Sequence, residues 1–168
     1  MTSELEAALE ETERHLERLG RELLLRCLEP GIPGHRVREE LARVGLPSSG
    51  EVETLLGWHD GLADGPDQVL GRVSMFPGFY LYSIDDITAT YEAVRDDDRW
   101  KKGWLPVFAN GGGDFYVVDL SDTGHGEAGA PRAELVEHEP DHADGAGCAA
   151  DRSRRVRQPD RPATARRA

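Results

Sequence analysis

Residues 104–119 read WLPVFANGGGDFYVVD, and this stretch decides the fold class. Two runs rich in β-branched and aromatic residues, 104–109 and 114–120, flank a short asparagine-glycine turn, which is the pattern of a β-hairpin. Pro106 predicts an edge position or a bulge in the first strand, because proline has no amide hydrogen to donate. The apolar run at residues 115–118 predicts that the second strand is covered on both faces.

The residues before this hairpin carry helical patterns. Leucines three and four residues apart between Leu5 and Leu23 form one stripe of an amphipathic helix, which Gly20 should bend or weaken. The Glu-Pro-Gly at residues 29–31 should end this helix, since proline is disfavoured inside helices. Further helices are expected over residues 35–44, 48–59 and 83–94, and further extended segments over residues 69–75, 79–82 and 133–138. Helices first and strands later predict an α+β fold, in which a small, mostly antiparallel sheet packs against N-terminal helices.

Two of these helices have clear start signals. Ser48 and Glu51 have the spacing of a capping box. Ser83 and Asp86 repeat that spacing later in the chain. His59 falls on the apolar face of the helix that begins near Ser48, and the Asp-Gly pair that follows should end that helix.

Charge divides the chain into an acidic body and an arginine-rich tail. The 168 residues carry 20 Lys and Arg against 32 Asp and Glu, a net charge of −12. Residues 141–168 hold seven arginines, four aspartates and one large aliphatic side chain, Val156, so residues 1–140 carry −15. Such a tail buries too little apolar surface to offset its ordering entropy. We therefore expect an N-terminal amphipathic helix within residues 1–30, a folded domain over 31–140 and a disordered tail over 141–168.

The composition argues against several classes of protein. The acidic balance disfavours direct nucleic-acid binding, which needs a basic surface to replace phosphate counterions. No stretch approaches roughly 18 consecutive apolar residues, and the acidic start is unlike a secretory signal or a transit peptide. Cys27 and Cys148 form neither a disulfide framework nor a zinc pattern, and no histidine spacing suits a metal. We expect a cytoplasmic protein without a metal, another cofactor or a membrane partner.

Two segments could carry chemistry, and each has a structural alternative. The glycines between Asn110 and Asp114 could cradle an anion, but they open a strand and end in a carboxylate, so a hairpin turn is favoured. The adjacent His59 and Asp60 suggest a catalytic dyad or a metal site, but neighbouring helical residues point about 100° apart. A hydrolase that uses His59, Asp60 or Asp114 is the remote alternative to a non-enzymatic protein.

Three motifs in this order resemble the SUKH superfamily, also called the Smi/Knr domain. They are the LLGWHDG of residues 55–61, the LYSIDDI of residues 81–87 and the WLPVF and GGDFYVVD within residues 104–119. The segment from Pro131 to Glu139 is similar to the strand that follows in that family. The resemblance covers roughly residues 35–140.

The resemblance implies an α+β domain with a central sheet flanked by helices and without known enzymatic activity. Bacterial members are typically immunity proteins that bind and neutralise a secreted or contact-delivered toxin, often a nuclease. The fungal relative is a regulator of cell-wall synthesis that works through protein contacts. The residues that match the family pattern are candidates for partner binding: Trp58, Asp60, Gly61, Trp104, Gly113 and Asp114.

The chain departs from the family pattern at its end. Family members usually close with a further helix packed on the sheet, whereas here Glu139-Pro140-Asp141 leads into the arginine-rich tail. Loss of that helix would leave part of the sheet uncovered. The Ala, Arg, Asp and Pro residues of the tail have GC-rich codons, so a frameshifted end is an open alternative.

The sequence therefore favours a cytosolic, non-enzymatic protein that binds a cognate toxin one to one and occludes its active surface. Tryptophans expected at the surface would anchor the contact. The acidic charge suits a basic nuclease, because complementary charge raises the association rate. The alternative is a regulatory or scaffold module of the same fold that acts through protein contacts.

Removing residues 142–168 should change the melting temperature by only a few degrees, because the deletion removes almost no apolar side chain. Thermal unfolding of the full and shortened chains, followed by circular dichroism, measures the difference. A large decrease would show that the tail docks on the domain.

Overall fold

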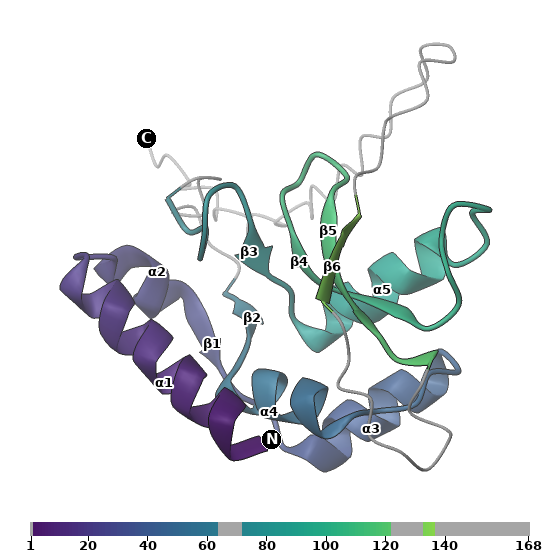
Figure 1. Ribbon diagram of the computed structural model, residues 1–168, viewed down its shortest axis with the longest axis horizontal. Coiled ribbons are helices and arrows are strands. Elements are labelled where there is room, and N and C mark those ends of the chain that lie inside the picture. Colours follow the sequence, from purple (N-terminus) through teal and green to yellow (C-terminus); the bar gives the residue numbers. More distant parts are fainter. Residues whose placement is uncertain (1, 64–71, 122–132, 137–168) are drawn as a thin grey trace, which may run out of the picture.

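The computed structural model describes residues 2–63, 72–121 and 133–136. The elements in these ranges are α1 (Thr2–Arg18), α2 (Glu22–Cys27), β1 (Leu28–Pro30), α3 (Gly34–Arg43), α4 (Gly50–Trp58), β2 (His59–Leu62), β3 (Tyr80–Leu81), α5 (Ile84–Val94), β4 (Trp104–Ala109), β5 (Phe115–Asp119) and β6 (Ala133–Val136). In Figure 1, α1 and α2 lie on the left, β3–β6 and α5 lie on the right, and α3 and α4 run along the bottom. The prediction of an α+β fold is confirmed.

The main sheet is four-stranded and antiparallel, in the order β3-β4-β5-β6. The predicted hairpin forms its centre, with Ala109 opposite Phe115. A bulge lies between Pro106 and Phe108, at the point where proline cannot donate to the ladder. β3 pairs only with the last two residues of β4, so Pro106 lies beyond the end of β3.

The strand β5 is less covered than its sequence predicts. Phe115 and Val117 are buried against the helices, whereas Tyr116 and Val118 on the other face are half-buried. The prediction that β5 is covered on both faces is therefore wrong for the second face. There the described cover near Tyr116 is an aromatic loop, whose Phe79 ring centroid lies 4.8 Å from that of Tyr116.

The helix α4 differs from its prediction at its start. Ser49 is its N-cap, and the Ser49 hydroxyl accepts a hydrogen bond from the Val52 amide at 3.3 Å. Ser48 instead donates to the Glu53 carboxylate at 3.0 Å. The predicted capping box of Ser48 and Glu51 is therefore wrong. The cap lies one residue later, and Val52 has no polar side chain that could complete a box.

The end of α4 also differs from its prediction. His59 has an extended backbone and begins β2, which pairs antiparallel with β1. His59 therefore does not lie on the apolar face of a helix, and Asp60 and Gly61 belong to a strand. α4 ends before His59 because His59 pairs with Pro30 of β1, and this strand pairing competes with a further helical turn.

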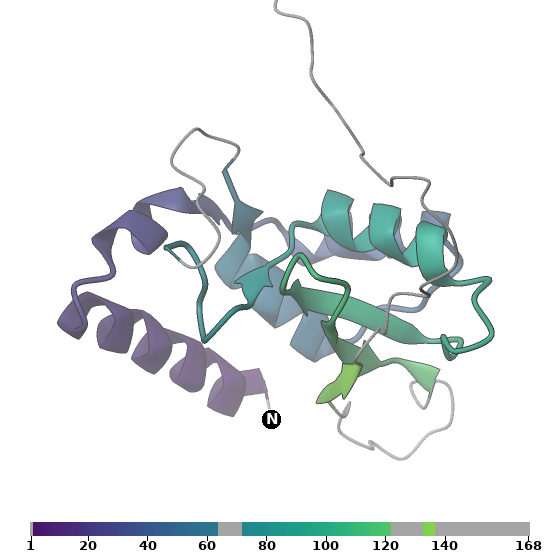
Figure 2. The same cartoon turned by 90° about the horizontal axis from the view of Figure 1, so that it is seen from above.

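The N-terminal stripe of leucines forms two helices instead of one. Gly20 adopts a positive φ of 66° between α1 and α2, so the predicted bend is a full break. α2 ends at Cys27, and Pro30 lies in the strand that follows. Figure 2 shows α1 apart from the main sheet, with α4 between them.

The buried side chains form two hydrophobic clusters. The larger cluster joins α3, α4 and α5 to β4 and β5, and its fully buried members include Leu41, Leu56, Ile87, Leu105 and Val117. The smaller cluster joins α1 and α2 to β1, β3 and the segment before β3, and consists of Leu16, Leu24, Leu28, Val73 and Leu81. α5 packs its buried face into the larger cluster. The predicted capping box of Ser83 and Asp86 at the start of this helix is confirmed.

Several predictions fall partly or wholly outside the described residues. The extended segment expected over 69–75 has no strand in its described part, residues 72–75. β6 covers the first four residues of the segment expected over 133–138. The expected tail and Cys148 lie outside the described residues. No helix within the described ranges is long and apolar enough to span a bilayer.

Gly61→Ala should lower the free energy of unfolding by about 3 kcal/mol or more, since strain at positive φ adds to overpacking. Gly61 has a φ of 78°, and an added Cβ would lie 2.4 Å from the Ser83 amide nitrogen. Gly45→Ala is the matched control, because Gly45 has a φ of 82° but open space around its Cα.

The control should cost only about 1–2 kcal/mol, which is the price of the left-handed backbone alone. Urea unfolding followed by tryptophan fluorescence measures both variants. Equal losses of stability in the two variants would show that the approach of Gly61 to Ser83 adds nothing.

Candidate protein-binding site

Asp60 and Gly61 of β2 contact the residues at the start of α5. The Asp60 carboxylate accepts a hydrogen bond from the Ile84 amide at 2.7 Å. This contact satisfies one of the amides that a helix leaves unpaired at its N-terminus. Burial raises the pKa of the Asp60 carboxyl, and the hydrogen bond from Ile84 opposes that shift. In this structure both residues position α5 against β2.

Trp104 is a core residue. Only 6% of its surface is exposed, and it belongs to the larger hydrophobic cluster. Its ring meets that of Trp100 edge to face, with 5.8 Å between the centroids, and the Lys101 ammonium lies 4.3 Å from its centroid. The expectation of a surface tryptophan is therefore wrong at this position, because β4 is buried on both faces.

Gly113 and Asp114 belong to the hairpin turn. The Asn110 side-chain oxygen accepts hydrogen bonds from the amides of Gly112 and Asp114, at 2.7 and 3.1 Å. The Asn110 amide group donates in turn to the Asp114 carboxylate. Gly113 has a φ of 105°, which explains a glycine at this place. The turn amides that could cradle an anion are therefore held by Asn110, which sequence reasoning had not assigned to them.

His59 and Asp60 do not face each other as a dyad. His59 Nδ1 lies 2.9 Å from the Glu29 carbonyl oxygen, whereas the Asp60 carboxylate contacts the amide of Ile84. In the part of the chain that the structure describes, no three His, Cys, Asp or Glu side chains are grouped so that they could hold a metal ion. The arrangement around His59 therefore offers structural contacts.

Trp58 is the predicted site residue that lines a surface groove. Its side chain is half-buried against the smaller hydrophobic cluster. Its indole nitrogen donates a hydrogen bond to the Glu13 carboxylate of α1 at 3.2 Å. This contact fixes the ring at the boundary between α1 and α4.

The α1–α4 groove has a volume of about 530 Å³ and lies where these two helices pack side by side (Figure 1). Its walls are Glu6, Leu9 and Glu10 from α1 and Gly50, Glu53, Thr54, Gly57 and Trp58 from α4, with Gly34 beside them. Glu53 accepts hydrogen bonds from Arg38 and Ser48. The Glu6 and Glu10 carboxylates are exposed and have no ion pair within the described residues. The groove therefore offers negative charge beside an aromatic ring.

Sequence reasoning found Trp58 but missed the part that α1 plays beside it. The leucine stripe of α1 identified its buried face. The pattern did not predict which element would pack against that face. The only available signal was the excess of glutamate on α1, which carries six glutamates and two arginines. An acidic helix face can pack beside many elements, so the groove could be identified only from the tertiary structure.

Comparison with known proteins gives one family. The family model described as "SMI1 / KNR4 family (SUKH-1)" matches residues 39–141. A search of curated proteins found no match to the chain. The matched range excludes α1 and α2. It contains all six residues that match the family pattern, called the signature residues below: Trp58, Asp60, Gly61, Trp104, Gly113 and Asp114.

Asp60→Asn should leave the protein at least as stable as the wild type at pH 7. The pKa of Asp60 is raised above its ordinary value of 3.8, so ionisation of this carboxyl costs the folded state more than the unfolded state. Stability is therefore lost as the pH rises through 3.8 towards the raised pKa, and it stays lost at neutral pH. Asparagine keeps the acceptor for the Ile84 amide without the charge. Urea unfolding of both proteins at pH 7 and pH 3 should show a difference that closes at the lower pH.

Asp60→Ala is the control, because alanine removes the acceptor as well as the charge. It should be less stable than Asp60→Asn by about 1 kcal/mol, since one amide at the start of α5 loses its partner. If Asp60→Asn is instead clearly less stable than the wild type at pH 7, the ionised carboxylate stabilises the helix terminus. Ionisation of Asp60 would then stabilise the folded state, contrary to the expectation.

Proposed function

Since the chain belongs to the SMI1/KNR4 (SUKH-1) family, we propose that it is an immunity protein, a non-enzymatic domain that binds a cognate bacterial toxin and neutralises it. Family membership supports a domain that acts through protein contacts. The structure adds a groove in which negative charge and a fixed indole ring lie side by side. That groove is the observation that carries the proposal.

The proposed contact surface is the α1–α4 groove, with Trp58 as its anchor. Among the signature residues, Trp58 lines this groove, whereas Trp104 lies in the core and Asp60 holds α5. We assign Gly61 to the contact between β2 and α5, and Gly113 and Asp114 to the hairpin turn. A tryptophan held at one edge loses little side-chain entropy when a partner covers it.

The proposed partner surface is basic. Glu6 and Glu10 have no cation of their own among the described residues, so a lysine or arginine of the partner would meet charges that no internal ion pair competes for. An arginine or lysine can also stack on the indole of Trp58, where the cation meets the ring quadrupole. Nucleases present basic surfaces to their substrate, so occupation of such a surface by this acidic groove would block the substrate without any chemistry.

The proposal is tested by protection of living cells. The protein is expressed in a sensitive bacterium together with each secreted toxin domain encoded in the genome from which it comes, and survival is scored. Protection against one toxin, together with a 1:1 complex of the purified pair, is the expected result. Protection without a complex would contradict binding as the mechanism. If the protein protects against none of these toxins, the regulatory or scaffold alternative is favoured.

The groove is tested with charge variants in that complex. Glu6→Gln/Glu10→Gln should lower the association rate about tenfold at low salt, because these carboxylates steer a basic partner. Glu17→Gln/Glu39→Gln is the matched control, because it removes the same charge from exposed sites outside the groove. The control should lower the rate by about threefold at most, through the change in net charge alone.

Stopped-flow fluorescence at two salt concentrations measures both pairs of variants. Equal effects of the two pairs would place the contact elsewhere on the acidic surface, while the protection assay would still stand.

A further inference from the structure

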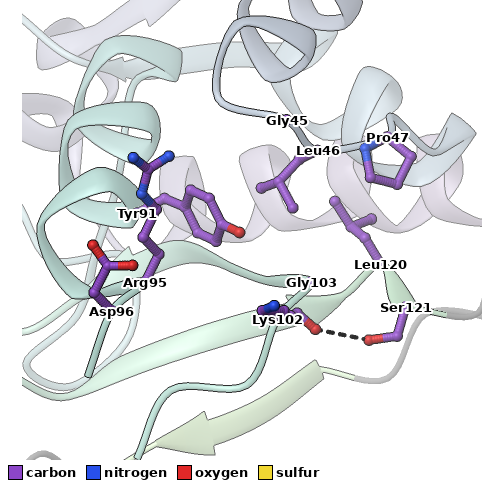
Figure 3. Close-up of a pocket in the computed structure, with 10 residues that line it drawn as sticks. All are labelled: Gly45, Leu46, Pro47, Tyr91, Arg95, Asp96, Lys102, Gly103, Leu120 and Ser121. Atoms are coloured by element: carbon purple, nitrogen blue, oxygen red, sulfur yellow. Dashed lines mark hydrogen bonds between the residues drawn. The ribbon is translucent and has the colours of Figure 1, made fainter. Parts of the chain in front are cut away.

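A second pocket, on the far side of α4 from α1, has a different chemistry. It has a volume of about 520 Å³ and lies between the α3–α4 connection, the end of α5 and the two segments that flank the β4–β5 hairpin (Figure 3). Its apolar lining comes from Leu46, Pro47, Leu120 and the ring of Tyr91. The size falls within the range of small-molecule sites, which runs from about 300 to 1,000 Å³.

The Tyr91 hydroxyl is the polar group at the centre of this pocket. Only 6% of the Tyr91 surface is exposed. Figure 3 shows its hydroxyl directed into the pocket towards Leu46 and Leu120. The hydroxyl has no hydrogen-bond partner within the residues that the structure describes. A phenol held in an apolar wall with a vacant donor favours a ligand that accepts a hydrogen bond.

Two cations line the same pocket. Arg95 follows α5 and Lys102 precedes β4, and neither side chain has an ion pair in the described ranges. Figure 3 shows Lys102 on the opposite side of the Tyr91 hydroxyl from Leu46, and the Arg95 guanidinium beside the Tyr91 ring, directed away from the hydroxyl. One carboxylate, Asp96, also lines the pocket, so its lining carries a net charge of +1 in a chain whose net charge is −12.

We propose that this pocket binds a carboxylate carried on a short apolar body. The Tyr91 hydroxyl donates a hydrogen bond to one carboxylate oxygen, Lys102 balances its charge, and Leu46, Pro47 and Leu120 cover the apolar body. A monoanion matches the single net positive charge of the lining. A phosphate dianion fits less well, because Asp96 would repel its second charge.

This site is independent of toxin neutralisation. None of its lining residues belongs to the α1–α4 groove. Its charge has the opposite sign, so a basic surface that suits the groove would not suit this pocket. The ligand can be a free organic acid or the C-terminal carboxylate of a peptide, since both present the same group.

The first test uses 4-methylpentanoate as the probe and its amide as the control. Titration of the isotope-labelled full-length protein should shift the amide resonances of Gly103 and Ser121, with an affinity in the roughly millimolar range expected of so few atoms. The amide, which has the same shape without the charge, should shift them at least about tenfold more weakly, because a hydrogen bond to a charged group is worth more than one to a neutral group. Equal binding of the acid and the amide, or no shift from either, would overturn the proposal.

The second test uses three variants. Tyr91→Phe keeps the buried ring and removes only the hydroxyl, so it should weaken acid binding about threefold. Lys102→Gln should weaken it about fivefold or more, through loss of the cation. Lys101→Gln removes the same charge one residue away, from a side chain that lies over the Trp104 ring and does not line the pocket.

The Lys101→Gln variant should bind within about twofold of the wild type, because its ammonium lies over the Trp104 ring and does not line the pocket. Circular dichroism and thermal unfolding confirm that each variant is folded. Unchanged binding in folded Tyr91→Phe and Lys102→Gln would overturn the assignment of these groups.

The two sources of the carboxylate are separated with peptides. A short peptide that ends in leucine is compared with its C-terminal amide and with 4-methylpentanoate. Tighter binding of the free-acid peptide than of the small acid assigns the pocket to a protein C-terminus. Binding of the small acid alone assigns it to a free organic acid. Binding of the amidated peptide as tightly as the free-acid peptide would overturn the proposal.

Discussion

The close approach of β2 to the start of α5 is the constraint on which the two halves of this protein depend. A Cβ on Gly61 would lie 2.4 Å from the Ser83 amide nitrogen, and Asp60 holds the Ile84 amide at 2.7 Å. β2 pairs with β1 beside the smaller hydrophobic cluster, whereas Ile84 begins the helix that fills the larger one. One glycine and one carboxylate therefore set how closely β2 approaches the start of α5, next to the packing of α1 and α2 against Leu81 of the main sheet.

This constraint separates the roles of neighbouring signature residues. Trp58 ends α4 and points towards α1, while Asp60 and Gly61 turn towards α5. A similar division holds in the hairpin, where Trp104 fills the core and Asp114 joins the turn network of Asn110. Residues that recur together in a sequence motif can therefore serve a scaffold, and only their surroundings show which of them a partner could touch.

The α1–α4 groove and the second pocket differ in charge because they form from different elements. The α1–α4 groove takes its unpaired carboxylates, Glu6 and Glu10, from a helix outside the family-matched range. The second pocket takes its cations from the segments after α5 and before β4, within that range. Charge then selects the ligand, since desolvated groups of like sign repel over short distances. An acidic protein can thus hold one site for a basic surface and another for a carboxylate.

The sequence by itself determined the α+β class, the β4–β5 hairpin, a weak point at Gly20 and the capping box at Ser83. All of these depend on neighbours within a few residues, through glycine and proline geometry, side-chain caps and periodic apolar residues. Only the tertiary structure decided that His59 begins a strand, that Trp104 is buried and that α1 completes a groove with Trp58. These depend on contacts between segments far apart in the chain, because strand pairing and burial are set by the partner element, which local patterns do not identify.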